Sequence, residues 1–310
     1  MLDDVRQQRA CAEAFKRDPA RLSINTQGPA VAQNVTIPYS GAYLGVHPKF
    51  PKAALRSIDF FLARSLILAP HVATRRGLAE REEVDLAIAL QRMEELNNGD
   101  SESRTLAEIV AVDFNRLMAN LNLLDAAGIR ALPQLGEIGI SQRMRVAASH
   151  LIRYADESAV RALSHHRSDT VRGIAAFAVA ELGRGAGVSN ILSSIESFAD
   201  DQHFGVREWA WMAVREDLAA ALGEAIEALV SWTSSPQPFI RRFAIEVLRP
   251  RGVWAKHIAV LRAQPEIGIP LLDPLNRERE KYVQDSVANW LNDAAKDHPA
   301  LGYLPYANGG

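Results

Sequence analysis

A glutamate lies among arginines in one short stretch of this chain, where a buried helix would normally carry an aliphatic side chain. The stretch covers residues 239–254 and reads Phe-Ile-Arg-Arg-Phe-Ala-Ile-Glu-Val-Leu-Arg-Pro-Arg-Gly-Val-Trp. Residues three and four apart share a helix face, so Glu246 faces Arg242 and Arg249. An acid among guanidinium groups, beside an aromatic ring, suits a polyanionic ligand that carries a local positive charge. The other members of this group are Arg241, Arg251 and Trp254.

Glu246 allows two interpretations. A buried, unpaired carboxylate costs several kcal/mol, so this side chain must be paired or lie at the surface. The first interpretation is a structural ion pair between stacked helices. The second is an acid that takes part in chemistry, since perturbed carboxylates gather at functional sites.

A second polar stripe lies on the predicted helix at residues 282–296. Its members recur at a spacing of three to four residues, which places them on one face. Asn289 and Asp293 lie one turn apart, whereas Asp285 and Lys296 fit a solvated end of the same face. The stripe comprises Asp285, Asn289, Asn292, Asp293 and Lys296.

The elements that must position these side chains repeat along the chain. Each copy has an aliphatic residue, then an arginine in four of the five copies, and a small or aliphatic residue one turn later. The copies are Met144–Ala148, Val171–Ala175, Val206–Ala210, Ile240–Ala244 and the degenerate Val283–Val287, at intervals of 27, 35, 34 and 43 residues. Such intervals are typical of paired-helix repeats, although coincidence in an alanine-rich helical chain is the alternative. We therefore predict an all-α protein, a right-handed α-solenoid of HEAT-like helical repeats.

The repeat register makes Glu246 stand out. Six residues after each leading aliphatic residue, the copies carry His150, Phe177, Met212, Glu246 and Asn289. Glu246 and Asn289 depart from ordinary packing residues, and they belong to successive repeats. Since successive repeats stack, Glu246 and Asp293 are expected to lie on the same concave surface. The repeat arginines are expected either to bind carboxylates of the neighbouring repeat or to reach that surface.

Helical periodicity also gives the domain organisation. It predicts helices over 72–97, 101–123, 206–221 and 282–296. We expect an N-terminal helical region at 1–135 with a long loop or arm at about 23–51, HEAT-like repeats forming a concave face at 136–300, and a tail at 301–310.

Composition narrows the class of protein. The chain has 310 residues, a formal net charge of −2 and one cysteine, Cys11, which fits a reducing compartment. No apolar run reaches the ~20 residues needed to span a bilayer, and the N-terminus is too charged for a secretory signal. We expect a cytoplasmic monomer without a cofactor. His165 and His166 fit a helix–helix turn, because further metal ligands at set spacing do not accompany them.

The segments 238–254 and 282–299 resemble the HEAT-repeat DNA alkylation repair glycosylases, and the AlkC branch more than the AlkD branch. Trp232 and the 47-residue interval from Glu246 to Asp293 also fit. The resemblance is specific over 203–299 and weaker over 140–200. It matches Arg242 and Glu246 to the family's arginine and glutamate, and Asp293 to its aspartate. Trp254 matches its aromatic residue.

The resemblance implies a nucleoid-associated enzyme that binds duplex DNA on its concave face and hydrolytically excises N-alkylated purines such as 3-methyladenine or 7-methylguanine. A cationic base is already a good leaving group, so a carboxylate need only stabilise the oxocarbenium-like sugar or position water. Glu246 and Asp293 are the expected catalytic residues. The expected DNA or lesion contacts are Arg207, Arg241, Arg242, Arg249, Arg251, Trp209, Trp254 and Asn289.

Two departures from the family pattern keep alternatives open. His203 stands where the family carries a further glutamate, eight residues farther from Glu246 than in the family, and Glu208 is the candidate substitute. The immunoglobulin-like domain often seen in AlkC proteins is not expected, given the short tail. A non-catalytic HEAT-repeat DNA-binding protein and a protein-interaction scaffold are therefore the alternatives.

Overall fold

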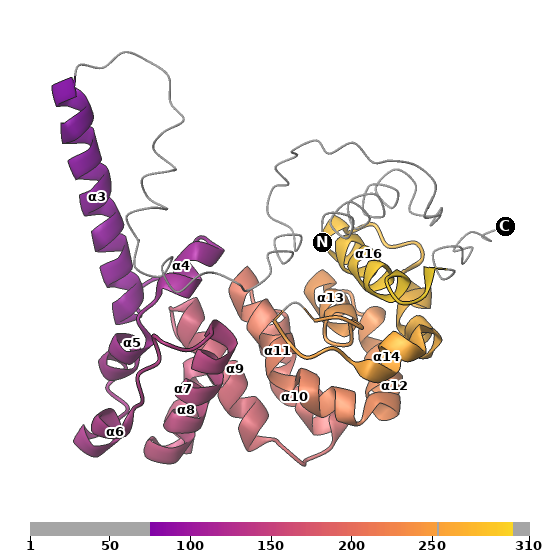
Figure 1. Ribbon diagram of the computed structural model, residues 1–310. Coiled ribbons are helices and arrows are strands. Elements are labelled where there is room, and N and C mark those ends of the chain that lie inside the picture. Colours follow the sequence, from indigo (N-terminus) through magenta and orange to yellow (C-terminus); the bar gives the residue numbers. More distant parts are fainter. Residues whose placement is uncertain (1–74, 253, 300–310) are drawn as a thin grey trace.

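The computed structural model describes residues 75–252 and 254–299, and every regular element in them is helical. The helices follow one another across the molecule in chain order, from α3 at one end to α16 at the other (Figure 1). This arrangement is the predicted all-α solenoid. The predicted arm at 23–51, Cys11 and the tail at 301–310 lie outside the described residues.

The first described helices lie together at one end of the row (Figure 1). They are α3 (Arg75–Asn98), α4 (Leu106–Ala111), α5 (Phe114–Asn120) and α6 (Ala126–Ala131). The prediction of a single helix over 101–123 was wrong, because α4 and α5 are separate helices. Asp113 accepts a hydrogen bond from the Arg116 amide and so starts α5, while Ser103 is held outside any helix by two hydrogen bonds to Asp169.

The repeats build two layers from residue 140 onward. One layer holds α7 (Ile140–Tyr154), α9 (Asp169–Leu182), α11 (Phe204–Ala220), α13 (Pro238–Glu246) and α16 (Lys281–Ala295). The other holds α8 (Glu157–Ala162), α10 (Val188–Ala199), α12 (Leu222–Thr233), α14 (Ala259–Ala263) and α15 (Ile269–Leu272). Short 3₁₀ turns lie at Leu163–His165, Pro265–Gly268 and Asp273–Leu275.

The predicted register is confirmed, because each copy falls at the same place in the first layer. All five leading aliphatic residues and all five residues one turn later are buried. The small alanines let neighbouring helices approach closely, while the aliphatic residues fill the space between the layers. The core is therefore continuous from α3 to α16.

Gly173 shows how close this packing is. A Cβ at Gly173 on α9 would lie 2.5 Å from Cδ1 of Trp209 on α11, and Trp209 is buried. Gly173→Ala is therefore expected to destabilise the protein by about 1–3 kcal/mol through overpacking, although alanine favours helix by about 1 kcal/mol. Urea unfolding measures this change.

The matched control is Gly223→Ala on α12, where an added Cβ meets no atom within 4 Å. That variant should be neutral or slightly stabilising. Equal effects of the two substitutions would contradict the close approach of α9 and α11.

Among residues 75–252 and 254–299, no helix combines the length and apolar character needed to cross a bilayer.

Candidate functional site

Glu246 is the last residue of α13, and its carboxylate is buried and paired. Its side chain is 1% exposed. The Ser286 hydroxyl of α16 donates to Oε1 at 2.7 Å, and Arg249 Nη1 donates to Oε2 at 3.1 Å. The expectation that this acid must be paired is confirmed.

Arg249 joins Glu246 to Asp293 of the next repeat. Its Nε and Nη2 lie 2.9 and 2.8 Å from Asp293 Oδ2, while Nη1 holds Glu246. Both carboxylates are almost fully buried, and so is the arginine between them. The structure therefore brings Glu246 and Asp293 together through one guanidinium, as predicted, but their expected place on a concave surface was wrong, because both carboxylates are buried.

A third carboxylate enters the group from α11. Glu208 Oε1 accepts from Arg242 Nη2 at 2.6 Å, and the same nitrogen lies 3.6 Å from Glu246 Oε1. Trp211 Nε1 donates to Glu208 Oε2 at 2.8 Å, and the Tyr282 ring lies 4.3 Å from the Arg242 guanidinium carbon. The carboxylate cluster, as we name it, comprises Glu208, Arg242, Glu246, Arg249, Ser286 and Asp293.

Electrostatic interactions favour the charged forms of Glu246 and Arg249. Burial opposes ionisation of Glu246, but Arg249, Arg242 and the Ser286 hydrogen bond outweigh it, so the pKa of Glu246 lies below its ordinary 4.5. Burial likewise opposes the charge of Arg249, yet Asp293 and Glu246 raise its pKa above the ordinary value. Glu246 and Arg249 therefore carry opposite charges at neutral pH.

Acidification should remove the stability that Glu246 contributes. Because its pKa is lowered on folding, the folded state binds fewer protons than the unfolded chain near pH 4.5. This contribution is fully present above that pH and is lost as the pH falls through the lowered pKa. The midpoint of thermal unfolding, measured from about pH 6 to about pH 3, should fall less steeply in Glu246→Gln than in the parent protein. Parallel curves would contradict the lowered pKa.

The strap, residues 247–252 and 254–258, links α13 to α14 and carries Trp254. Trp254 stacks on the buried Trp209 with ring centroids 6.4 Å apart at 25°. Its carbonyl lies 3.4 Å from the Ser141 hydroxyl, which donates to it from α7. The two predicted tryptophans thus lie together. No described hydrogen bond joins either of them to the carboxylate cluster.

The repeat arginines follow a shared pattern. In Arg172, Arg207 and Arg241, Nη1 donates to the carbonyls five and six residues earlier. Arg172 also binds Asp201, and Arg241 binds Glu278, each a carboxylate in the loop before the next repeat. Of the two expectations for these arginines, binding to the neighbouring repeat is the one confirmed for Arg172 and Arg241.

The other predicted contacts are also engaged by protein groups. The guanidinium carbon of Arg207 lies 3.9 and 5.1 Å from the ring centroids of Phe239 and Tyr282, which also contact each other. Arg251 pairs with Asp297 at 2.6 Å. Asn289 is half-buried, one turn before Asp293. DNA contact by any of them stays a prediction.

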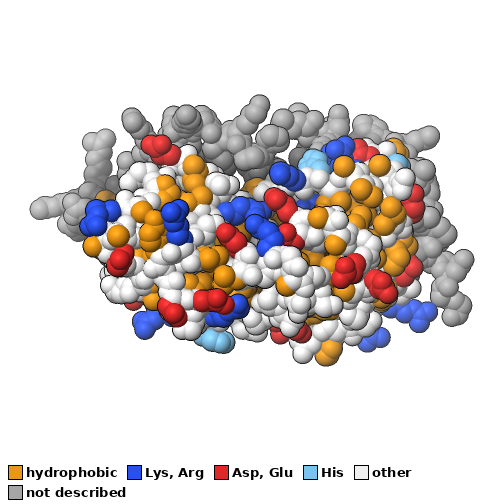
Figure 2. Space-filling model, turned by 90° about the horizontal axis from the view of Figure 1, so that it is seen from below, with side chains coloured by type: hydrophobic (Ala, Val, Ile, Leu, Met, Phe, Trp, Pro, Cys, Tyr) orange, Lys and Arg blue, Asp and Glu red, His pale blue; other side chains and the backbone are white. Residues whose placement is uncertain are grey.

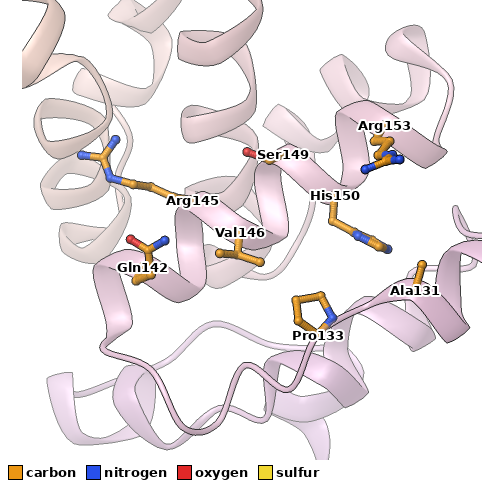
Figure 3. A pocket seen from close by; sticks show the side chains of 8 residues that line it. All are labelled: Ala131, Pro133, Gln142, Arg145, Val146, Ser149, His150 and Arg153. Carbon is orange, nitrogen blue, oxygen red and sulfur yellow. The ribbon is translucent and has the colours of Figure 1, made fainter.

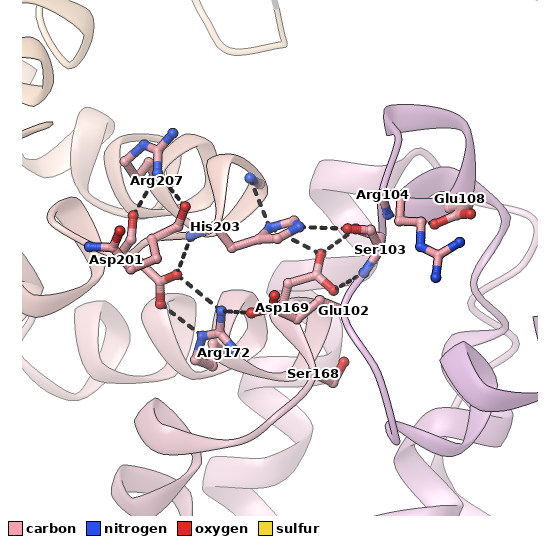
Figure 4. A network of polar contacts seen from close by, with 12 residues as sticks. Glu102, Ser103, Arg104, Glu108, Ser168, Asp169, Arg172, Asp201, His203 and Arg207 are labelled. Carbon is pink, nitrogen blue, oxygen red and sulfur yellow. Dashed lines mark hydrogen bonds and ion pairs between the residues drawn. The ribbon is translucent and has the colours of Figure 1, made fainter. Parts of the chain in front are cut away.

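His203 lies outside the carboxylate cluster, in a junction between α11 and the N-terminal helices (Figure 4). It caps α11 by accepting from the Gly205 amide, and its Nε2 lies 2.7 Å from the Ser103 carbonyl. Nδ1 lies 3.5 Å from Asp169, which binds Ser103. Of the two accessory candidates, Glu208 is the one that joins the cluster.

Two surfaces carry no predicted catalytic residue. A groove of about 340 Å³ runs beside α7, with Arg145 and Arg153 at its two ends and Pro133 opposite (Figure 3). The face drawn in Figure 2 mixes acidic and basic side chains and has no continuous basic stripe. In the described part of the chain, no group of three or more His, Cys, Asp or Glu could hold a metal ion.

The fold and the comparisons define the class as a helical-repeat solenoid with a DNA-repair-glycosylase-like fold. Within this class, the chain is similar to the Pseudomonas fluorescens alkylpurine DNA glycosylase AlkC, solved bound to DNA containing an abasic site analog. The likeness has a TM-score of 0.50 and 25% identity, and covers 68% of this chain and 57% of that one. The resemblance to AlkC inferred from sequence is confirmed.

A second relative is the uncharacterized protein YhaZ of Bacillus subtilis, 30% identical over 192 residues. The match covers 61% of this chain and 51% of YhaZ. The chain therefore spans little more than half the length of the proteins it matches. No family model matches it.

Proposed function

We propose that this protein is a DNA-alkylation repair glycosylase that binds duplex DNA and hydrolytically excises cationic N-alkylated purines such as 3-methyladenine or 7-methylguanine. The observation that carries the proposal is the pairing of Glu246 and Asp293 through Arg249. The likeness to AlkC, a protein solved with DNA, supports it. Repeats 136–300 are the proposed DNA-binding unit.

The chemistry follows from the charges. A purine alkylated at N3 or N7 carries a positive charge and leaves without strong acid catalysis. Positive charge then develops on the deoxyribose, where Glu246 or Asp293 stabilises it or orients the attacking water. Both carboxylates are buried in the free protein, so DNA binding must bring the sugar to a carboxylate oxygen that a guanidinium or hydroxyl group holds beforehand.

Trp254 and the arginines have supporting roles in this proposal. The indole face of Trp254 contacts the cationic base or the sugar. Arginines near the cluster contact phosphates flanking the lesion once they exchange their protein partners for DNA.

Base release tests the proposal directly. The purified protein is incubated with a duplex that contains 7-methylguanine, and free base is measured against an unmodified duplex. Release above background supports the proposal. Binding without release supports a non-catalytic DNA-binding protein, an alternative favoured by the full pairing of all three carboxylates. Absence of any gel shift on plain duplex at moderate salt supports a protein-interaction scaffold.

A further inference from the structure

Arg215 of α11 holds the strap by its backbone. Its side chain is 1% exposed. Nη1 donates to the Val247 carbonyl at 2.7 Å, Nη2 to the Arg249 carbonyl at 2.6 Å, and Nε to the Lys256 carbonyl at 3.2 Å. One guanidinium therefore fixes both ends of the strap.

This arrangement is energetically unusual. Among the described residues, no carboxylate lies within ion-pair distance of Arg215, although burial strongly disfavours an isolated charge. Burial, together with repulsion from Arg249, lowers the pKa of Arg215 to about 10. An aliphatic side chain of similar length would fill the space without burying a charge, so the donors themselves must serve a purpose.

The role of the Arg215 donors follows from the two side chains that the strap carries, Arg249 and Trp254. The carbonyl of Arg249 is bound to Arg215, while the side chain of Arg249 reaches Glu246 and Asp293. Trp254 lies between the two anchored ends and stacks on Trp209 of the same helix α11. A shift of the strap would therefore move the bridging guanidinium and the indole together.

We propose that Arg215 is a positioning residue that sets the strap, so that Arg249 joins the two carboxylates and Trp254 stacks on Trp209. The catalytic consequence rests on the proposed function, whereas the placement of the strap does not. The planar fork of arginine is required, because its N–H groups point in fixed directions toward three separate carbonyls. Lysine keeps the charge but has a single nitrogen and cannot reproduce this geometry.

The chain provides a matched control in Arg143 of α7. Arg143 is also buried, and its Nε, Nη1 and Nη2 donate to the carbonyls of Ile138, Val110 and Gly136 at 2.9, 3.0 and 3.1 Å. The chemistry matches that of Arg215, but Arg143 holds the end of α4 and the loop before α7, which carry neither Arg249 nor Trp254. Arg143→Lys therefore measures how much thermal stability the protein loses when any such buried guanidinium is replaced.

The experiment compares Arg215→Lys and Arg143→Lys by three measurements. These are the midpoint of thermal unfolding, the acrylamide quenching of Trp254 emission, isolated by subtracting a Trp254→Phe background, and 7-methylguanine release. Both variants should lose thermal stability. Only Arg215→Lys should raise the quenching of Trp254 and lower kcat for release by about 10- to 100-fold, with DNA affinity nearly unchanged.

Gly252→Ala keeps the buried arginine and provides a second test if Arg215→Lys does not fold. A Cβ at Gly252 would lie 3.2 Å from Arg215 Nε and 3.0 Å from Ala255 Cβ. It should therefore displace the strap and raise Trp254 quenching while the core stays intact.

Unchanged Trp254 quenching in both Arg215→Lys and Gly252→Ala would overturn the positioning role. So would equal quenching in Arg215→Lys and Arg143→Lys. If the parent protein releases no base, the proposed function is wrong. The comparison of Trp254 quenching still decides whether Arg215 holds the strap in position.

Discussion

Glu246→Gln is expected to lower the rate of 7-methylguanine release about 100- to 1,000-fold, the range seen when one preorganised electrostatic group is removed from an active site. The amide keeps the shape of the side chain and one acceptor oxygen, so the Ser286 hydrogen bond can persist. What it loses is the negative charge that would face the developing oxocarbenium ion. Affinity for the lesion-containing duplex should therefore change little.

Single-turnover release and fluorescence anisotropy with the same duplex separate the two effects. Asp293→Asn should behave like Glu246→Gln, since Arg249 binds both carboxylates. The matched control is Asp201→Asn, which neutralises a carboxylate held by Arg172 through two hydrogen bonds at 2.8 and 3.0 Å, outside the cluster. If all three variants lose the same activity, the carboxylate cluster has no special part in the reaction.

Arg249→Met is expected to destabilise the folded protein by about 3–5 kcal/mol, the usual cost of removing one partner from a buried ion pair. The substitution leaves Glu246 and Asp293 buried near each other without the cation between them. Neutralising both acids as well should recover part of the loss, because the uncompensated charges then disappear. The triple variant should therefore be more stable than Arg249→Met alone.

Urea unfolding of the single and triple variants measures this coupling. Arg262→Met is the control: Arg262 binds Asp297, but its side chain is 37% exposed, so that pair should contribute no more than about 1 kcal/mol. A triple variant less stable than Arg249→Met would show that Arg242 and Lys296, which lie 3.6 and 3.5 Å from Glu246 and Asp293, compensate the two charges without Arg249.

Much of the fold could be predicted from the sequence because the repeat is a local signal. An aliphatic residue and a small residue one turn apart fix which face of each helix is buried, and Met144, Val171 and Val206 all obey this rule. The same register identified Glu246 as a departure. By contrast, the hydrogen bonds that hold Ser103 outside α4 come from Asp169, a residue 66 positions away, and periodicity does not detect so distant a contact.

The candidate site was predicted only in part, and the arginines show why. The sequence around an arginine near an acid does not show whether its guanidinium binds DNA, a carboxylate or a backbone carbonyl. Arg241 was expected at DNA and binds Glu278, which is 37 residues away. Ser286 and Arg215 were missed, because a serine inside a helix and an arginine near a helix end carry no signal of their own. The spacing of Arg172, Arg207 and Arg241 from the loops they close could have indicated a structural role.

The arginine-to-carbonyl pattern also bears on how the chain assembles. In Arg172, Arg207 and Arg241, the hydrogen bonds to carbonyls five and six residues earlier join each helix to the loop just before it, so each such turn can close locally. The bond between Arg249 and Asp293 spans 44 residues instead. Contacts between residues close in sequence form earlier than contacts between distant residues, so the repeats can fold stepwise along the chain. The carboxylate cluster can form only after α16 has packed against α13. Local unfolding of α16 would therefore disrupt the cluster first and leave the earlier repeats folded.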